Sequence, residues 1–152
     1  MARVLVVGAT GILCPAAASL VARGDAVTGV SRTSDGEPDG VQPLLGDAHD
    51  AGLFDGSWDS AVVYAPAVSD ESLAAIRSRV DGRVVLVRVS AAVDPALGDP
   101  HVPDDVLQLG WFDEDAGARW HTPTEVSAAA LAVLDDGVGR TLGSVRPWDR
   151  RP

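Results

Sequence analysis

The stretch Val4-Leu5-Val6-Val7-Gly8-Ala9-Thr10-Gly11-Ile12-Leu13 decides the fold of this chain. Its apolar run predicts a strand over 3–7, and the Ala-rich segment after it predicts a helix over 15–23 that stops at Gly24. Gly8 permits a sharp turn off the strand, and Gly11 has no Cβ, so backbone N–H groups can approach a diphosphate at the helix start. This order predicts a dinucleotide-binding turn made by Gly8, Thr10, Gly11 and Ile12. A tight turn that binds no ligand is the alternative.

Strand and helix patterns alternate along the rest of the chain. Further strands are predicted over 26–31, 41–45, 60–65, 83–89, 106–112 and 140–145. Helices are predicted over 70–80 and 123–134, the second opened by a capping box from Thr122 to Glu125, and a helical turn over 51–54. Segments 33–40 and 94–105 are predicted loops, and 113–117 an acidic turn. This alternation predicts an α/β fold, a single Rossmann-like domain over 1–152 with a doubly wound, mainly parallel sheet.

Composition narrows the classes of function. The net charge of the 152 residues is −10, which argues against nucleic acid and anionic membrane surfaces as partners. All 12 basic residues are arginine, so Schiff-base chemistry on a lysine is excluded. The single cysteine, Cys14, excludes an intramolecular disulfide, and no His or carboxylate spacing indicates a metal site. No signal peptide or membrane span is recognisable, so a cytoplasmic protein is expected.

The glycine turn Gly8-Ala-Thr-Gly11 resembles that of short-chain dehydrogenase/reductase proteins of the extended and atypical type. Segments 109–111, 119–127 and 143–152 resemble a group of short Rossmann proteins that carry the same label. The resemblance implies a Rossmann fold truncated relative to full-length relatives, a nicotinamide dinucleotide and, by analogy, a homodimer. Two departures stand out. Cys14 replaces the third glycine, and the Tyr-x-x-x-Lys signature is absent, since Tyr64 is the only tyrosine. The helix that carries this pair is expected to be missing between strands 83–89 and 106–112.

Two residues bear on the choice of cofactor. Arg32 follows the second strand, where an acidic residue would bind the ribose of NAD, so it favours the 2′-phosphate of NADP, with NAD also possible. Asp47 follows the third strand, where relatives often place an aspartate near the adenine. A solvated arginine and a simple turn aspartate are the alternatives.

Ser90, Arg88 and Tyr64 are the candidate catalytic residues. Strand alternation predicts Arg88 and Ser90 on one face at the end of the fifth strand, and Ser90 stands where relatives carry a catalytic serine. Tyr64 ends the fourth strand and could present its phenol to the same crevice. A structural ion pair, a turn serine and a core tyrosine are the alternatives.

These residues leave three functions open. The first is an NAD(P)H-dependent enzyme that reduces or epimerises a small-molecule metabolite. The second is a redox-silent isomerase, lyase or cyclase that uses acid–base residues of the same crevice. The third is a non-catalytic dinucleotide sensor or partner subunit. Trp111, Trp120 and Trp148 could wall a pocket for a planar ligand, or pack a lid or a dimer interface.

Overall fold

A seven-stranded parallel sheet forms the centre of the computed structural model, which describes residues 1–33 and 35–152. Ser34, inside the predicted 33–40 loop, lies outside the described residues. The strand order is β3-β2-β1-β4-β5-β6-β9, and every neighbouring pair is parallel. The strands are β1 (Arg3–Val7), β2 (Ala26–Ser31), β3 (Gln42–Leu45), β4 (Ser60–Tyr64), β5 (Val84–Arg88), β6 (Val106–Leu109) and β9 (Arg140–Leu142).

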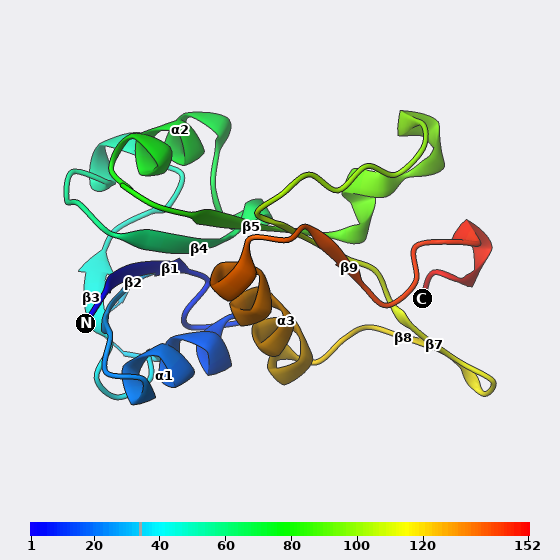
Figure 1. Ribbon diagram of the computed structural model, residues 1–152, viewed down its shortest axis with the longest axis horizontal. Helices are drawn as coiled ribbons and strands as arrows, with labels where there is room; N and C mark the ends of the chain where they lie inside the picture. The colour runs from blue at the N-terminus through cyan, green and yellow to red at the C-terminus, as the bar shows by residue number, and fades with distance from the viewer. Residues whose placement is uncertain (34) are drawn as a thin grey trace.

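Helices cover both faces of this sheet (Figure 1). Helices α1 (Cys14–Ala22) and α3 (Pro123–Asp136) pack together on one face, and α2 (Asp70–Ser78) lies on the other with the 3-10 turn η1 (Ala51–Leu53). The capping box that opens α3 is present as predicted, with the Thr122 side chain accepting from the Glu125 N–H and the Glu125 carboxylate accepting from the Thr122 N–H. The doubly wound, mainly parallel α/β fold is therefore confirmed.

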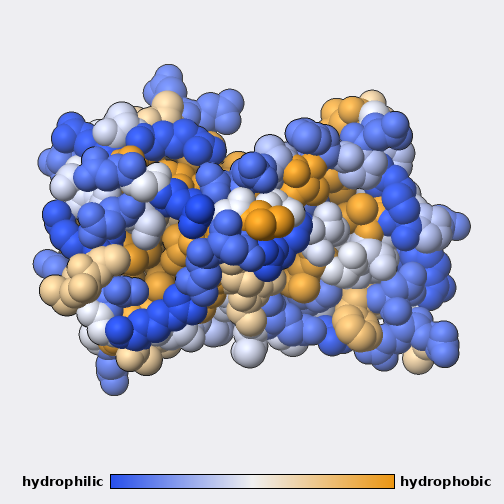
Figure 2. Space-filling view, in the orientation of Figure 1, coloured by the Kyte–Doolittle hydropathy of each residue, from blue (hydrophilic) through white to orange (hydrophobic). Residues whose placement is uncertain are grey.

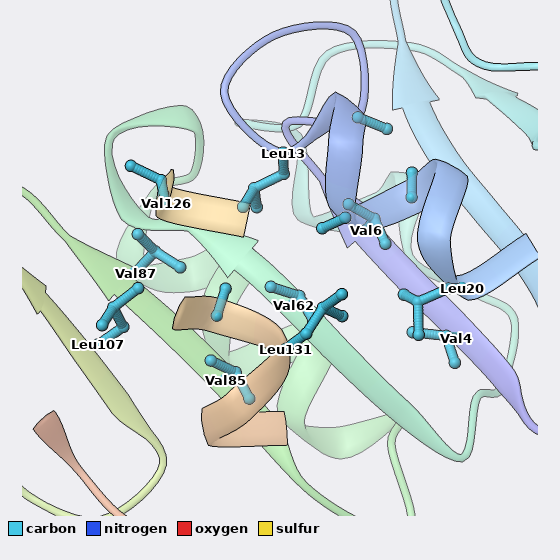
Figure 3. Packing of buried hydrophobic residues seen from close by; sticks show 14 of the residues in the cluster. Val4, Val6, Leu13, Leu20, Val62, Val85, Val87, Leu107, Val126 and Leu131 are labelled. Carbon is cyan, nitrogen blue, oxygen red and sulfur yellow. The ribbon is translucent and has the colours of Figure 1, made fainter. Parts of the chain in front are cut away.

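Alternation along the central strands buries both faces of the sheet. Val4 and Val6 of β1 pack towards α1 and α3, whereas Leu5 and Val7 pack towards α2. The same division holds in β4 and β5, so these strands carry the near-continuous apolar runs typical of buried parallel sheets. Figure 3 shows Leu13 and Leu20 of the α1 segment above β1, and Val126 and Leu131 of α3 above β4 and β5.

The C-terminal third differs most from the predicted elements. The strand predicted over 106–112 ends at Leu109, because Trp111 forms an antiparallel bridge with Ser144 that takes the chain out of the parallel sheet. Gly110 permits this approach, since a Cβ there would collide with the Ser144 carbonyl oxygen. The predicted acidic turn is the tip of a hairpin formed by β7 (Phe112–Glu114) and β8 (Gly117–Arg119). Between β5 and β6 the described chain forms only 3-10 turns, η3 (Ser90–Val93) and η4 (Pro95–Leu97).

The outer surface is largely hydrophilic on the face shown in Figure 2, and apolar residues show mainly in the hollows between polar ones. Among the described residues, no helix has both the length and the apolar character needed to cross a bilayer.

Candidate functional site

Two pockets lie on either side of the glycine turn, where the strand order reverses. From β1 the chain continues to β2 and β3 on one side, then crosses to β4, β5 and β6 on the other. All these strands are parallel, so their carboxyl ends meet at one edge of the sheet. The crevice at such a switch point is where doubly wound sheets bind ligands. We name the two pockets by the strands whose ends line them, the β1–β3 pocket and the β4–β6 pocket.

The glycine turn between the pockets is built by local hydrogen bonds. Gly8 has a φ of +114°, which L side chains rarely adopt, and its carbonyl accepts from the N–H groups of Gly11 and Leu13, both at 3.0 Å. The N–H groups of Thr10 and Ile12 have no acceptor among residues 1–33 and 35–152. No side chain of the described residues caps α1, and the first turn of this helix carries no acidic residue. The turn thus presents unused donors at the positive end of a helix, which favours an anion.

The β1–β3 pocket has a volume of about 440 Å³ and gathers the predicted cofactor residues Gly8, Thr10, Arg32 and Asp47. Arg32 is 78% exposed, and its Nη2 lies 3.5 Å from Asp47 Oδ2. The backbone N–H of His49 donates a hydrogen bond to the Asp47 carboxylate. This bond, the His49 ring and Arg32 together lower the pKa of the Asp47 carboxyl. Asp35 also lines the pocket, so the positive charge of Arg32 is partly offset.

The β4–β6 pocket has a volume of about 280 Å³. It contains two predicted catalytic residues, Tyr64 and Ser90, and the predicted cofactor residue Ile12. Val89, Leu109 and Val126 add apolar side chains to the wall, and Trp120 adds an aromatic one. The lining residues are Ile12, Tyr64, Val89, Ser90, Leu109, Gly110, Trp120, His121, Val126 and Arg151. The sheet edge therefore places Tyr64 and Ser90 together.

Arg88 does not line the β4–β6 pocket, so the prediction that Arg88 and Ser90 lie on one face is wrong. Strand β5 ends at Arg88, and η3 begins at Ser90, so the alternation that would align the two side chains is broken. Arg88 lines a separate groove beside α2 and donates from Nη2 to the carbonyl oxygen of His101 at 2.7 Å. Burial lowers the pKa of its guanidinium.

The C-terminal segment also enters the β4–β6 pocket. Arg151 Nε donates to Ser90 Oγ at 2.9 Å, and its guanidinium carbon lies 5.2 Å from the ring centroids of both Trp120 and Trp148. Ser90 itself is only 3% exposed. The pocket is therefore closed on one side by a guanidinium held between two indole rings.

His121 is a second pocket residue outside the predicted set. Its side chain is 3% exposed, and Nε2 lies 3.1 Å from the carbonyl oxygen of Leu142, which requires the proton on Nε2. Nδ1 is buried without a hydrogen-bond partner among the described residues. No local pattern in the sequence places either His121 or Arg151 near Ser90. Only the assembled fold brings them there.

Comparisons with known proteins agree with this architecture. No model of a protein family matches the chain, and no curated protein sequence matches it. Solved structures, by contrast, do match the chain. The enzyme WbmH of Bordetella bronchiseptica, in complex with NAD+, gives a TM-score of 0.64 at 15% identity, covering 94% of this chain and 75% of that one. UDP-N-acetylglucosamine 4-epimerase of Bacillus cereus gives 0.57 at 12%, covering 95% and 78%. The oxidoreductase ylbE of Lactococcus lactis gives 0.58 at 13%, covering 91% and 88%. At these identities the likeness establishes the fold, a Rossmann-like α/β sheet.

Proposed function

We propose that this protein binds NADP(H) and reduces or epimerises a small-molecule substrate. One observation carries the proposal: the unpartnered N–H groups of Thr10 and Ile12 lie between two pockets at the switch point. A diphosphate would accept from these donors and meet the uncapped start of α1. The fold shared with an NAD+ complex, an epimerase and an oxidoreductase supports the same assignment.

The residues divide between the two halves of such a ligand. Gly8, Thr10, Arg32 and Asp47 would hold the adenosine half, and Ile12 borders the pocket that would take the nicotinamide end and the substrate. When bound, a reduced nicotinamide would supply the hydride that reduces a carbonyl carbon and would itself be oxidised, and the β4–β6 pocket would supply the proton that the carbonyl oxygen takes up.

The hydroxyls of Tyr64 and Ser90 are available in this pocket to orient and protonate an oxygen. No lysine can assist Tyr64. We therefore infer that Ser90 and Tyr64 act without the Tyr-x-x-x-Lys arrangement of the proteins that the glycine turn resembles.

Arg32 sets the preference between NADP and NAD. Its guanidinium would donate to a 2′-phosphate, but it is exposed and shares its charge with Asp47, so the interaction is worth only about 1 kcal/mol. That value corresponds to a preference of about fivefold.

Isothermal titration with NADPH and NADH tests the proposal. We expect both to bind, with Arg32→Ala weakening NADPH about fivefold and NADH hardly at all. Arg77→Ala removes the same charge from the exposed last turn of α2 and should change neither affinity. Asp47→Asn should shift the preference towards NADPH by removing a like charge from the pocket. Equal weakening of both nucleotides by Arg32→Ala would reject the 2′-phosphate contact, and no binding of either at millimolar concentration would reject the function.

The buried ring of His121 favours a second candidate, a redox-silent enzyme. With its proton on Nε2, Nδ1 is the basic nitrogen of a side chain that lines the β4–β6 pocket, and base chemistry of this kind needs no nicotinamide. Incubation with a metabolite extract freed of nicotinamide nucleotides separates the two candidates. Turnover that His121→Gln abolishes supports the second, whereas turnover that requires added NADPH supports the first.

A further inference from the structure

We propose that the β4–β6 pocket recognises a small organic carboxylate, and that Arg151 is the residue that binds the carboxylate group. This rests on the proposed function, because it names the substrate class of that site. Among the described lining residues, Arg151 alone carries a permanent charge, and no acidic side chain lines the pocket. A pocket of this kind disfavours cations and attracts anions.

In the part of the chain that the structure describes, neutral groups alone hold the Arg151 guanidinium. Its described contacts are the hydroxyl of Ser90 and the faces of Trp120 and Trp148, and no carboxylate of the described residues forms an ion pair with it. Only Nε donates a hydrogen bond within the described chain. The two terminal nitrogens keep their N–H groups, and this planar fork matches the two oxygens of a carboxylate.

The chain segment that carries Arg151 is also anchored by contacts outside the pocket. Its neighbour Arg150 donates to Asp113 at 2.7 Å, which ties the tail to the β7–β8 hairpin. Trp148 packs edge-on against the buried ring of Trp111, with centroids 5.9 Å apart. The guanidinium is therefore pre-organised, which lowers the ordering cost of binding.

The walls indicate the rest of the ligand. Ile12, Val89, Leu109 and Val126 give the pocket an apolar lining, and Trp120 adds an aromatic face. A volume of about 280 Å³ suits a compact molecule. With its carboxylate on Arg151, such a molecule would lie beside Ser90, because Nε already bonds that hydroxyl.

Titration of the whole chain with benzoate and its neutral isostere benzamide tests this inference, followed by calorimetry and by tryptophan fluorescence. We expect benzoate to bind at least about tenfold more tightly than benzamide. Arg151→Gln should remove that advantage and leave benzamide binding unchanged. The melting temperature should fall by no more than about 4 °C, because the variant loses the Ser90 bond and the two indole contacts. Arg151→Lys should keep part of the advantage of benzoate over benzamide, because the positive charge remains but the planar guanidinium fork is lost. The matched control Arg77→Gln should bind benzoate as the unaltered protein does.

Equal affinity for benzoate and benzamide would overturn the inference, as would unchanged benzoate binding by Arg151→Gln or no binding of benzoate at all. The same samples are titrated with NADPH. Arg151-dependent benzoate binding without NADPH binding would leave the carboxylate site standing and reject the proposed function. NADPH binding with equal affinity for benzoate and benzamide would leave the proposed function standing and reject the carboxylate site.

Discussion

Replacing Gly8 with alanine should destabilise the protein through two separate effects. The first is backbone strain, because a φ of +114° costs an alanine about 1–3 kcal/mol. The second is a close contact, because an added Cβ would lie 3.2 Å from the Cβ of Tyr64. That atom cannot swing away, since Tyr64 is paired with Val87 in the middle of the sheet. The contact adds about 1 kcal/mol or more.

The loss of chain entropy in the unfolded state offsets part of this cost, by about 0.4–1 kcal/mol. We therefore expect Gly8→Ala to lower the free energy of unfolding by about 1–4 kcal/mol, which corresponds to about 2–16 °C in melting temperature. Gly24→Ala is the matched control. Gly24 also has a positive φ, +93°, but nothing lies within 4 Å of its added Cβ, so only the strain and entropy effects apply.

Urea denaturation followed by circular dichroism measures both variants, with equal m-values as the check that unfolding remains two-state. The difference between the variants reports the contact with Tyr64. If Gly8→Ala proves as stable as Gly24→Ala, or more stable, then an added Cβ at Gly8 does not press against Tyr64 of β4, and the reasoning is refuted. The same variant should also weaken NADPH binding, because the turn that presents the Thr10 and Ile12 N–H groups is distorted.

Two further predictions concern the attachment of α3. The side chain of Arg119 and the N–H of Thr122 lower the pKa of Glu125 from 4.5 to about 2, so the stability that its charge contributes is full above pH 4.5 and is lost as the pH falls towards 2. Glu125→Gln keeps the capping geometry but not the charge. The stability deficit of this variant at pH 7 should therefore shrink to a small remainder in urea melts at pH 2, and a deficit of constant size from pH 7 to pH 2 would contradict this. Ser127→Ala removes the bond from Ser127 Oγ to the Ile12 carbonyl, 3.2 Å long, and should cost about 1 kcal/mol. Ser78→Ala, which removes an exposed hydroxyl bond within α2, should cost less than about 0.5 kcal/mol, and equal losses would show that Ser127 does not support the glycine turn.

Local patterns were sufficient to predict most of the sheet and helices. The run before Gly8 has the apolar character of a strand buried on both faces, and the capping box at Thr122 defines the start of α3 within one turn. Prediction was least accurate after Leu109, where a bridge between Trp111 and Ser144 ends the parallel strand. The partners of that bridge are 33 positions apart, so no local periodicity reports it.

The candidate site also has one part that the local sequence predicts and another that only the tertiary structure reveals. The sequence alone determined the glycine turn and placed Arg32 and Asp47 after neighbouring strands, because each depends only on where its own strand ends. Only the tertiary structure decided that Arg88 leaves the pocket, since the 3-10 turn η3 begins at Ser90 and the strand alternation ends there. It also decided that Arg151 closes the pocket, because a contact across 61 positions depends on how the tail packs against the hairpin and Trp111. Backbone propensity acts over a few residues, whereas the chemistry of a pocket depends on which distant chain segments the core brings together.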